Sequence, residues 1–274
     1  MLEAVLLFRD ALYGSLVIAL ACSVLGVYVV LRRIVFVGAT LAQISSAGIA
    51  LAYWLAGHGI ALGLASHPEA VSLAVTLGAV AFFATMGRGR VPPDARIGVA
   101  YALAAAAGIL LIAKAAIGEA HDIFLQGNIL GITRLDTVEL LGSTLPVLVA
   151  HTVFYKEFLF VSFDRETART LGYRVQRWDL ALYLTLGLVI AVAMQFAGVL
   201  LVFNFLVLPA VTGLLVSRSM RMTFVVSIVA ALLAAVVGFT LSIPFDLPTG
   251  PTMIAVSGAL VVLAWGVHKA RRGG

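Results

Sequence analysis

Long apolar blocks, separated by short polar connections, limit what this chain can fold into. Each block is about 17 to 22 residues long, the length that an α-helix needs to cross the hydrocarbon core of a bilayer. Hydrophobic residues fill 62% of the 274 positions and charged residues only 11%, so a water-soluble domain could not cover its apolar surface. The sequence therefore predicts an all-α polytopic membrane protein with about eight or nine transmembrane helices, forming one domain over 1–274. Nine segments are expected, one of them a candidate for a broken or re-entrant helix: 11–31, 36–56, 69–86, 97–117, 137–155, 178–196, 198–217, 222–243 and 251–268.

Basic residues are distributed unevenly between the connections. If the connection 156–177 is cytoplasmic, all of the 18 Lys and Arg residues lie on the cytoplasmic side except Arg9, Lys114 and Arg134. Such a bias is typical of membrane-protein orientation, and it predicts an external N-terminus and a cytoplasmic C-terminus. Because the basic residues occupy separate short loops, they do not form a patch for nucleic acid.

The interiors of the expected spans contain almost no ionisable side chains. Span 36–56 has none, and span 222–243 has none after Met222. Ion-coupled transporters and membrane-embedded enzymes usually place acids, histidines or a nucleophile with its base at membrane depth. The chain also lacks a G-x-x-x-x-G-K-[ST] phosphate-binding loop. We therefore expect neither an enzyme nor an ATPase, and transport against a gradient would have to be driven by another protein.

The longest cytoplasmic connection contains the signal for a short helix, within "SFDRETARTLGYRVQRWDL" at 162–180. Ser162 or Asp164 is placed to cap this helix, and Gly172 is placed to end it. Ala168 and Leu171 give it an apolar face. Because an isolated helix this short is marginal in water, we expect it to dock on the inner face of this chain or on another subunit.

This segment resembles the cytoplasmic coupling segment of ABC-transporter permeases of the metal-uptake family (ABC-3), the zinc and manganese importers. Three further blocks are similar to that family in order and spacing: "RRIVFVGATLAQISSAGIALAYW" (32–54), "AGVLLVFNFLVLPAVTGLLVSRSMR" (197–221) and "LSIPFDLPTGPTMIAV" (241–256). The resemblance implies a type II importer permease that acts as a homodimer in the bilayer of a prokaryotic plasma (inner) membrane. It implies a separate ATPase subunit that binds ATP and Mg²⁺, a substrate-binding protein outside, and no cofactor in this chain. The implied coupling residues are Ser162, Asp164, Arg165, Glu166, Ala168, Arg169, Leu171 and Gly172.

The chain departs from that family's pattern in its second span. The family's block has an acid after the glycine and a histidine four residues later, on one helical face where they could grip a divalent cation. Here Gly38 is followed by Ala39, and Gln43 occupies the histidine position. One hypothesis is that divalent metal, or a metal complex, still passes along a wet route of hydroxyl and amide groups. The candidate pathway residues are Thr40, Gln43, Ser46, Gln195 and Asn204.

The same departure is compatible with two further hypotheses. The cargo could be a non-metal small solute or a chelate, which would suit an amide and hydroxyl lining. Alternatively, the polar groups only hold helices together, because Gly38, Ala42, Ser46 and Ala50 form a stripe of small residues at i, i+4 spacing.

One cluster of polar residues and one histidine are further candidates for a specific role. Glu119, His121 and Asp122 lie within four residues on the expected external side and have the composition of a metal site. A polar helix end followed by a loop is the simpler interpretation of that cluster. His151 lies inside a span, where we expect it to make a hydrogen bond between packed helices.

Overall fold

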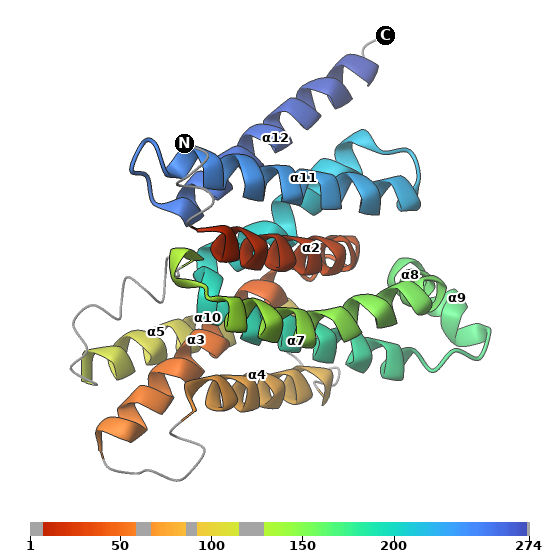
Figure 1. Cartoon of the computed structure of the whole chain (residues 1–274). Helices are drawn as coiled ribbons and strands as arrows, with labels where there is room; N and C mark the ends of the chain where they lie inside the picture. Colours follow the sequence, from red (N-terminus) through yellow and green to blue (C-terminus); the bar gives the residue numbers. More distant parts are fainter. Residues whose placement is uncertain (1–7, 59–66, 86–91, 115–128, 273–274) are drawn as a thin grey trace.

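The described part of the chain is a bundle of helices (Figure 1). The computed structural model describes residues 8–58, 67–85, 92–114 and 129–272, and these ranges contain no strand. The predicted all-α class is therefore confirmed. The elements are α2 (Arg9–Leu31), α3 (Val35–Gly57), α4 (Pro68–Thr85), α5 (Pro93–Lys114), η1 (Ile129–Gly131), α7 (Arg134–Val153), α8 (Tyr155–Phe163), α9 (Arg165–Thr170), α10 (Val175–Val216), α11 (Met220–Ser242) and α12 (Thr249–Arg272).

Six of the described helices are long and apolar enough to cross a membrane, namely α2, α3, α5, α10, α11 and α12. Helices α7 and α8 together form a further candidate, a span bent by 74° at the break between them. The apolar part of α4 is shorter. Each predicted span overlaps one of these helices, so the membrane class rests on both sequence and structure.

Helix α10 is the longest element and is broken near its middle. Its 42 residues would extend about 63 Å as a straight helix, roughly twice the hydrocarbon thickness. Gly198 interrupts the helix with φ 70° and ψ 169°, a conformation essentially confined to glycine. The predicted spans 178–196 and 198–217 are the segments on either side of this glycine.

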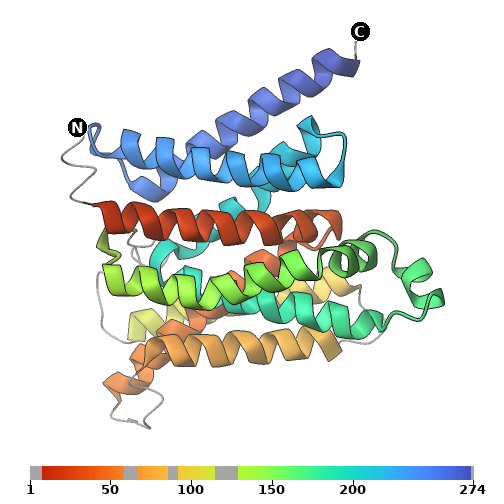
Figure 2. The same ribbon diagram turned by 45° about the vertical axis from the view of Figure 1, so that its right-hand side comes forward.

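The two halves of α10 organise the bundle around them. Figures 1 and 2 both show α2 lying between α11 and α7, and α10 passes behind α2 to contact α3, α4, α11 and α12 as well. In α2 and α10, 72% of the apolar window is buried, against 17% in α5 and 22% in α12. The core therefore lies around α2 and α10, and the apolar faces of α5 and α12 are left for lipid or another subunit.

Small residues allow the closest helix contacts. A Cβ added to Gly26 on α2 would lie 2.0 Å from the carbonyl oxygen of Leu206 on α10, so the two backbones touch there. On α3, Ala42 and Ala50 are fully buried and Ser46 is 6% exposed. The small-residue stripe therefore packs within this chain, as the helix-packing hypothesis predicts.

Candidate functional site: the coupling helix and the polar residues of the spans

Helix α9 is a single capped unit between α8 and α10. The Asp164 carboxylate accepts hydrogen bonds from the Thr167 amide (2.9 Å) and hydroxyl (2.5 Å), and these bonds lower the pKa of that carboxyl group. At the other end, Gly172 has φ 83°, and the amides of Gly172 and Tyr173 donate to Arg169 and Ala168 carbonyls in a Schellman arrangement. The predicted stop at Gly172 is confirmed.

Of the two predicted caps, the structure selects Asp164. Ser162 instead belongs to α8, where its hydroxyl donates to the Phe158 carbonyl at 2.5 Å. Both residues could accept a bond from a helical amide, but only Asp164 lies at the extended position immediately before α9. The cap and the stop together define a helix of six residues.

One side of α9 docks on its own chain, and the rest is exposed. Ala168 is fully buried against Val161 of α8 and Val175 of α10. Leu171, predicted to share this apolar face, is 66% exposed, and Glu166 and Arg169 are exposed as well. Figure 1 shows α9 projecting from one end of the bundle. The helix is therefore held in place while most of its surface stays available to a partner.

A shared carboxylate ties this region to the transmembrane helices. Asp179 on α10 binds Arg32, which follows α2, at 2.5 Å, and its second oxygen binds Arg165 of α9. The Arg32 side chain is only 4% exposed and also donates from Nε to the Ser162 hydroxyl at 2.8 Å. Burial lowers the pKa of Arg32, and the neighbouring Asp179 opposes that shift. We call Arg32, Ser162, Arg165 and Asp179 the Asp179 cluster.

Of the Asp179 cluster, the sequence singles out only Ser162 and Arg165 as coupling residues. Arg32 is one of the basic residues on the predicted cytoplasmic side, and its pairing with Asp179 joins residues 147 positions apart. A single acid among the basic residues Arg174 and Arg177 is the signal that could have drawn attention to Asp179.

Three of the five candidate pathway residues are enclosed by this chain's own helices. The fully buried Thr40 hydroxyl lies 2.8 Å from the Phe36 carbonyl and 3.3 Å from that of Ile97. Asn204 donates to the Ser257 hydroxyl at 3.0 Å, linking α10 to α12. Ser46 belongs to the buried stripe of α3. These contacts are the kind that pack helices together.

Gln43 and Gln195 are the two candidates with accessible surface. Gln43 is half-buried on the same side of α3 as the half-buried Ala39, so both altered family positions face away from the core. Gln195 lines a cavity of about 250 Å³ together with Glu69, Asp136 and Glu139. That cavity includes none of the other four candidates, so the five residues do not line one pocket.

The two remaining sequence predictions have different outcomes. Glu119, His121 and Asp122 lie outside the described residues, and the described ranges contain no group of three or more His, Cys, Asp or Glu placed to hold a metal ion. The predicted helix-packing bond of His151 is confirmed, because its Nε2 lies 3.0 Å from the Thr185 hydroxyl of α10. The His151 ring also stacks on Phe158 at 4.2 Å between centroids.

The bundle and the projecting, capped helix define a polytopic helical membrane protein with a short helix at one end of its spans. The sequence profile of the ABC 3 transport family matches residues 5–268, and the chain belongs to this family.

The chain is similar along most of its length to known transport proteins and to a solved structure. It is 28% identical to the "Manganese transport system membrane protein MntC" of Halalkalibacterium halodurans, over 94% of this chain and 86% of that protein. It is 27% identical to the "Probable iron transport system membrane protein" of Haemophilus influenzae, over 96% and 94%. In fold it is similar to a chain of PsaBC from Streptococcus pneumoniae, with a TM-score of 0.82 and 24% identity over 94% of this chain and 90% of that one.

Proposed function

We propose that this chain is the permease subunit of an ATP-driven importer of a divalent metal, manganese or iron, and that α9 couples it to a separate ATPase. The observation that carries the proposal is α9 itself. It is capped at both ends, docked through Ala168, and otherwise exposed at one end of the spans. Membership of the ABC 3 transport family supports the same role.

The Asp179 cluster provides a route for movement of α9 to reach the membrane. Arg165 belongs to α9, Arg32 follows α2, and Asp179 lies in the first turns of α10. An ATPase that shifts α9 would therefore pull on both central helices through one carboxylate. Because Arg32 is buried, separating it from Asp179 would be costly, and the helices are expected to move together.

In this chain the Gln43 side chain, rather than a carboxylate and imidazole pair, would contact a metal cargo. Gln43 and Ala39 are half-buried on one side of α3, and the proposed pathway runs along that side. An amide oxygen can contact a cation that keeps part of its water shell, at a lower desolvation cost than a dry site without counter-charge. The non-metal cargo is not favoured, because the relatives of this chain are named for manganese and iron.

The proposed assembly contains two copies of this chain, two ATPases and an external substrate-binding protein, in a prokaryotic plasma membrane. ATP and Mg²⁺ would bind the ATPase. We place α9, Arg32 and the C-terminus in the cytoplasm and the N-terminus outside. The separation of acids from the basic connection supports this orientation. Glu69 and Asp136 of the acid-lined cavity lie near the starts of α4 and α7. Helices α8 and α9 follow the opposite end of α7.

The test is manganese uptake by proteoliposomes that contain the chain with its ATPase and loaded binding protein. We expect Mn²⁺ or Fe²⁺ to stimulate ATP hydrolysis, and Gln43→Ala to reduce uptake by about tenfold, as for a lost polar contact to a charged group. Thr40→Val, which changes a buried hydroxyl, serves as the comparison for a helix-packing effect. If no divalent metal changes the rate of hydrolysis, the metal cargo is wrong.

A further inference from the structure

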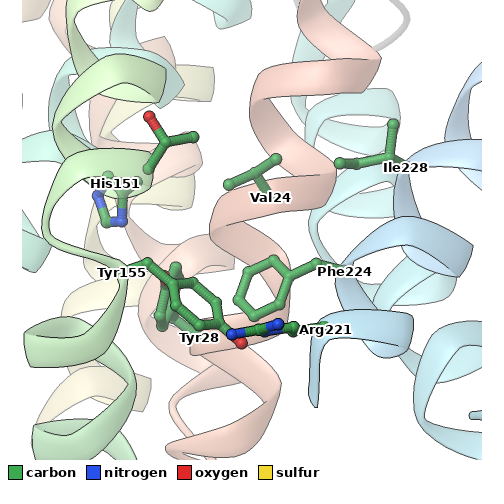
Figure 3. A pocket seen from close by; sticks show the side chains of 8 residues that line it. Val24, Tyr28, His151, Tyr155, Arg221, Phe224 and Ile228 are labelled. Carbon is green, nitrogen blue, oxygen red and sulfur yellow. The ribbon is translucent and has the colours of Figure 1, made fainter. Parts of the chain in front are cut away.

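A groove of about 290 Å³ lies on the surface of the bundle, and none of its lining residues belongs to α9 or to the acid-lined cavity. Helix α2 forms its floor, α11 forms one wall, and the end of α7 with the start of α8 forms the other (Figure 3). Val24 and Ile228 lie at one end of it, across from the His151 ring (Figure 3), and give that end two aliphatic side chains. The exposed side chains of Val225 and Val229 continue along α11, which means that the groove opens on an apolar, lipid-facing surface.

The other end of the groove is aromatic and carries a cation. The Phe224 ring packs against Tyr28 at 5.1 Å and against Tyr155 at 5.5 Å between centroids. Arg221, the second residue of α11, lies beside these rings at the same end (Figure 3). Its side chain is exposed, and no carboxylate within the described ranges forms an ion pair with it. Tyrosine and arginine at the end of a span are typical of the membrane–water interface.

We propose that this groove binds an anionic phospholipid, with part of one acyl chain between Val24 and Ile228 and the phosphate on Arg221. The aliphatic end points toward the membrane interior and the cation lies at the interface, which is the polarity of a lipid in its leaflet. The volume is slightly below the range of about 300–1,000 Å³ for sites that enclose a whole small ligand, so it suits a chain segment. The proposal depends on the proposed orientation only for the choice of the cytoplasmic leaflet.

A lipid bound here would add a second link between α11 and α8, which already touch through Phe224 and Tyr155. Arg221 belongs to α11, and Tyr155 begins α8, which leads directly to α9. The bound lipid would therefore hold the base of the coupling segment against α11.

Native mass spectrometry of the full-length chain tests the proposal. The protein is taken from bilayers of equal parts phosphatidylglycerol and phosphatidylethanolamine, and the lipids that stay bound in detergent are counted. We expect retained phosphatidylglycerol to fall about tenfold in Arg221→Gln, the loss expected for a charged hydrogen bond. Arg218→Gln makes the same charge change on a residue that does not line the groove, and should retain the lipid.

Groove-filling variants separate this site from general lipid adhesion. Val24→Trp and, from the opposite wall, Ile228→Trp should each remove the retained phosphatidylglycerol from protein that elutes as a folded species. Equal retention in Arg221→Gln and the unaltered chain, or equal loss in Arg218→Gln, would overturn the proposal. Equal retention of the two lipids would also overturn it. Disulfide cross-linking of two copies through Thr152→Cys would do the same, because a second copy would then cover the groove.

Discussion

At the scale of single residues, Asp179 joins two transmembrane helices to the coupling helix. It is the counter-charge for Arg32, whose side chain is almost fully buried, and it also binds Arg165 on the coupling helix. A buried cation that loses its partner is costly, whereas an exposed ion pair contributes little. Asp179 therefore fixes both the junction of α2 with α10 and the position of α9.

Asp179→Asn should destabilise the protein by about 3 kcal/mol, because Arg32 would stay buried without a counter-charge. The free energy of unfolding can be measured in detergent by thermal or denaturant unfolding. Glu166→Gln makes the same charge change on the exposed surface of α9 and should leave stability unchanged. Equal stability of the two variants would contradict this role of Asp179.

The cap of α9 should make this helix sensitive to acid. Because its hydrogen bonds to Thr167 lower the pKa of Asp164, the carboxylate stabilises the folded state above its unfolded pKa of about 3.9. That contribution disappears as the pH falls through the lower, folded pKa. Hydrogen exchange of the α9 amides should therefore show a loss of protection at acid pH, after correction for the intrinsic exchange rate.

Two variants separate the cap from other effects of acid on α9. Asp164→Asn keeps a capping oxygen and should protect α9 at all pH values, whereas Asp164→Ala should lose protection even at pH 7. An acid transition that survives unchanged in Asp164→Asn would assign it to another group.

At the scale of elements, the break at Gly198 divides α10 into two helical segments. Gly198 adopts a backbone conformation that side-chain-bearing residues avoid, and it is buried within the bundle. Close contacts such as Gly26 with Leu206 then fix the second segment against α2. The direction of α10 after the break determines where Asn204 lies relative to α12.

Gly198→Ala should therefore destabilise the protein by about 1–3 kcal/mol, because the added Cβ is strained at φ 70°. Thermal unfolding in detergent measures this loss. Gly258→Ala provides the control, since a Cβ added there meets nothing within 4 Å and alanine is the better helix former. If both substitutions stabilise the protein, the break at Gly198 does not exist in solution.

At the scale of the whole molecule, some helices are buried by this chain alone, whereas others expose apolar surface that lipid or another subunit would cover. Helices α2 and α10 are enclosed, whereas α5 and α12 expose apolar faces such as those of Leu110 and Leu263. Outside the spans, Leu171, the residue that follows α9, is 66% exposed. Burying this exposed leucine, at the end of a capped and projecting helix, against another protein would be favourable.

Leu171→Glu should reduce the amount of ATPase that copurifies with this chain by about tenfold, because a charge would enter an apolar contact. Its thermal unfolding temperature should match that of the unaltered chain, since Leu171 is exposed. Leu135→Glu, the same change on an 81% exposed residue of α7, should leave copurification intact. Full recovery of the ATPase with Leu171→Glu would show that α9 is not the contact.

The sequence by itself determined the class of this protein, the places of its spans and the capped helix of the long connection. Those features depend on local patterns, namely block length, the change from apolar to basic residues, and a capping acid followed by a glycine. The four resembling blocks also led to the correct family. All of these signals can be read from neighbouring residues.

Only the tertiary structure decided which polar residues are enclosed. The polar side chains of three candidates, Thr40, Ser46 and Asn204, would suit a pathway, but these residues are buried between packed helices. Gln43 is only half-buried. The Asp179 cluster and the groove at Arg221 each join helices far apart in sequence. No local pattern encodes such pairings, because they depend on how α2 is placed against α7, α10 and α11.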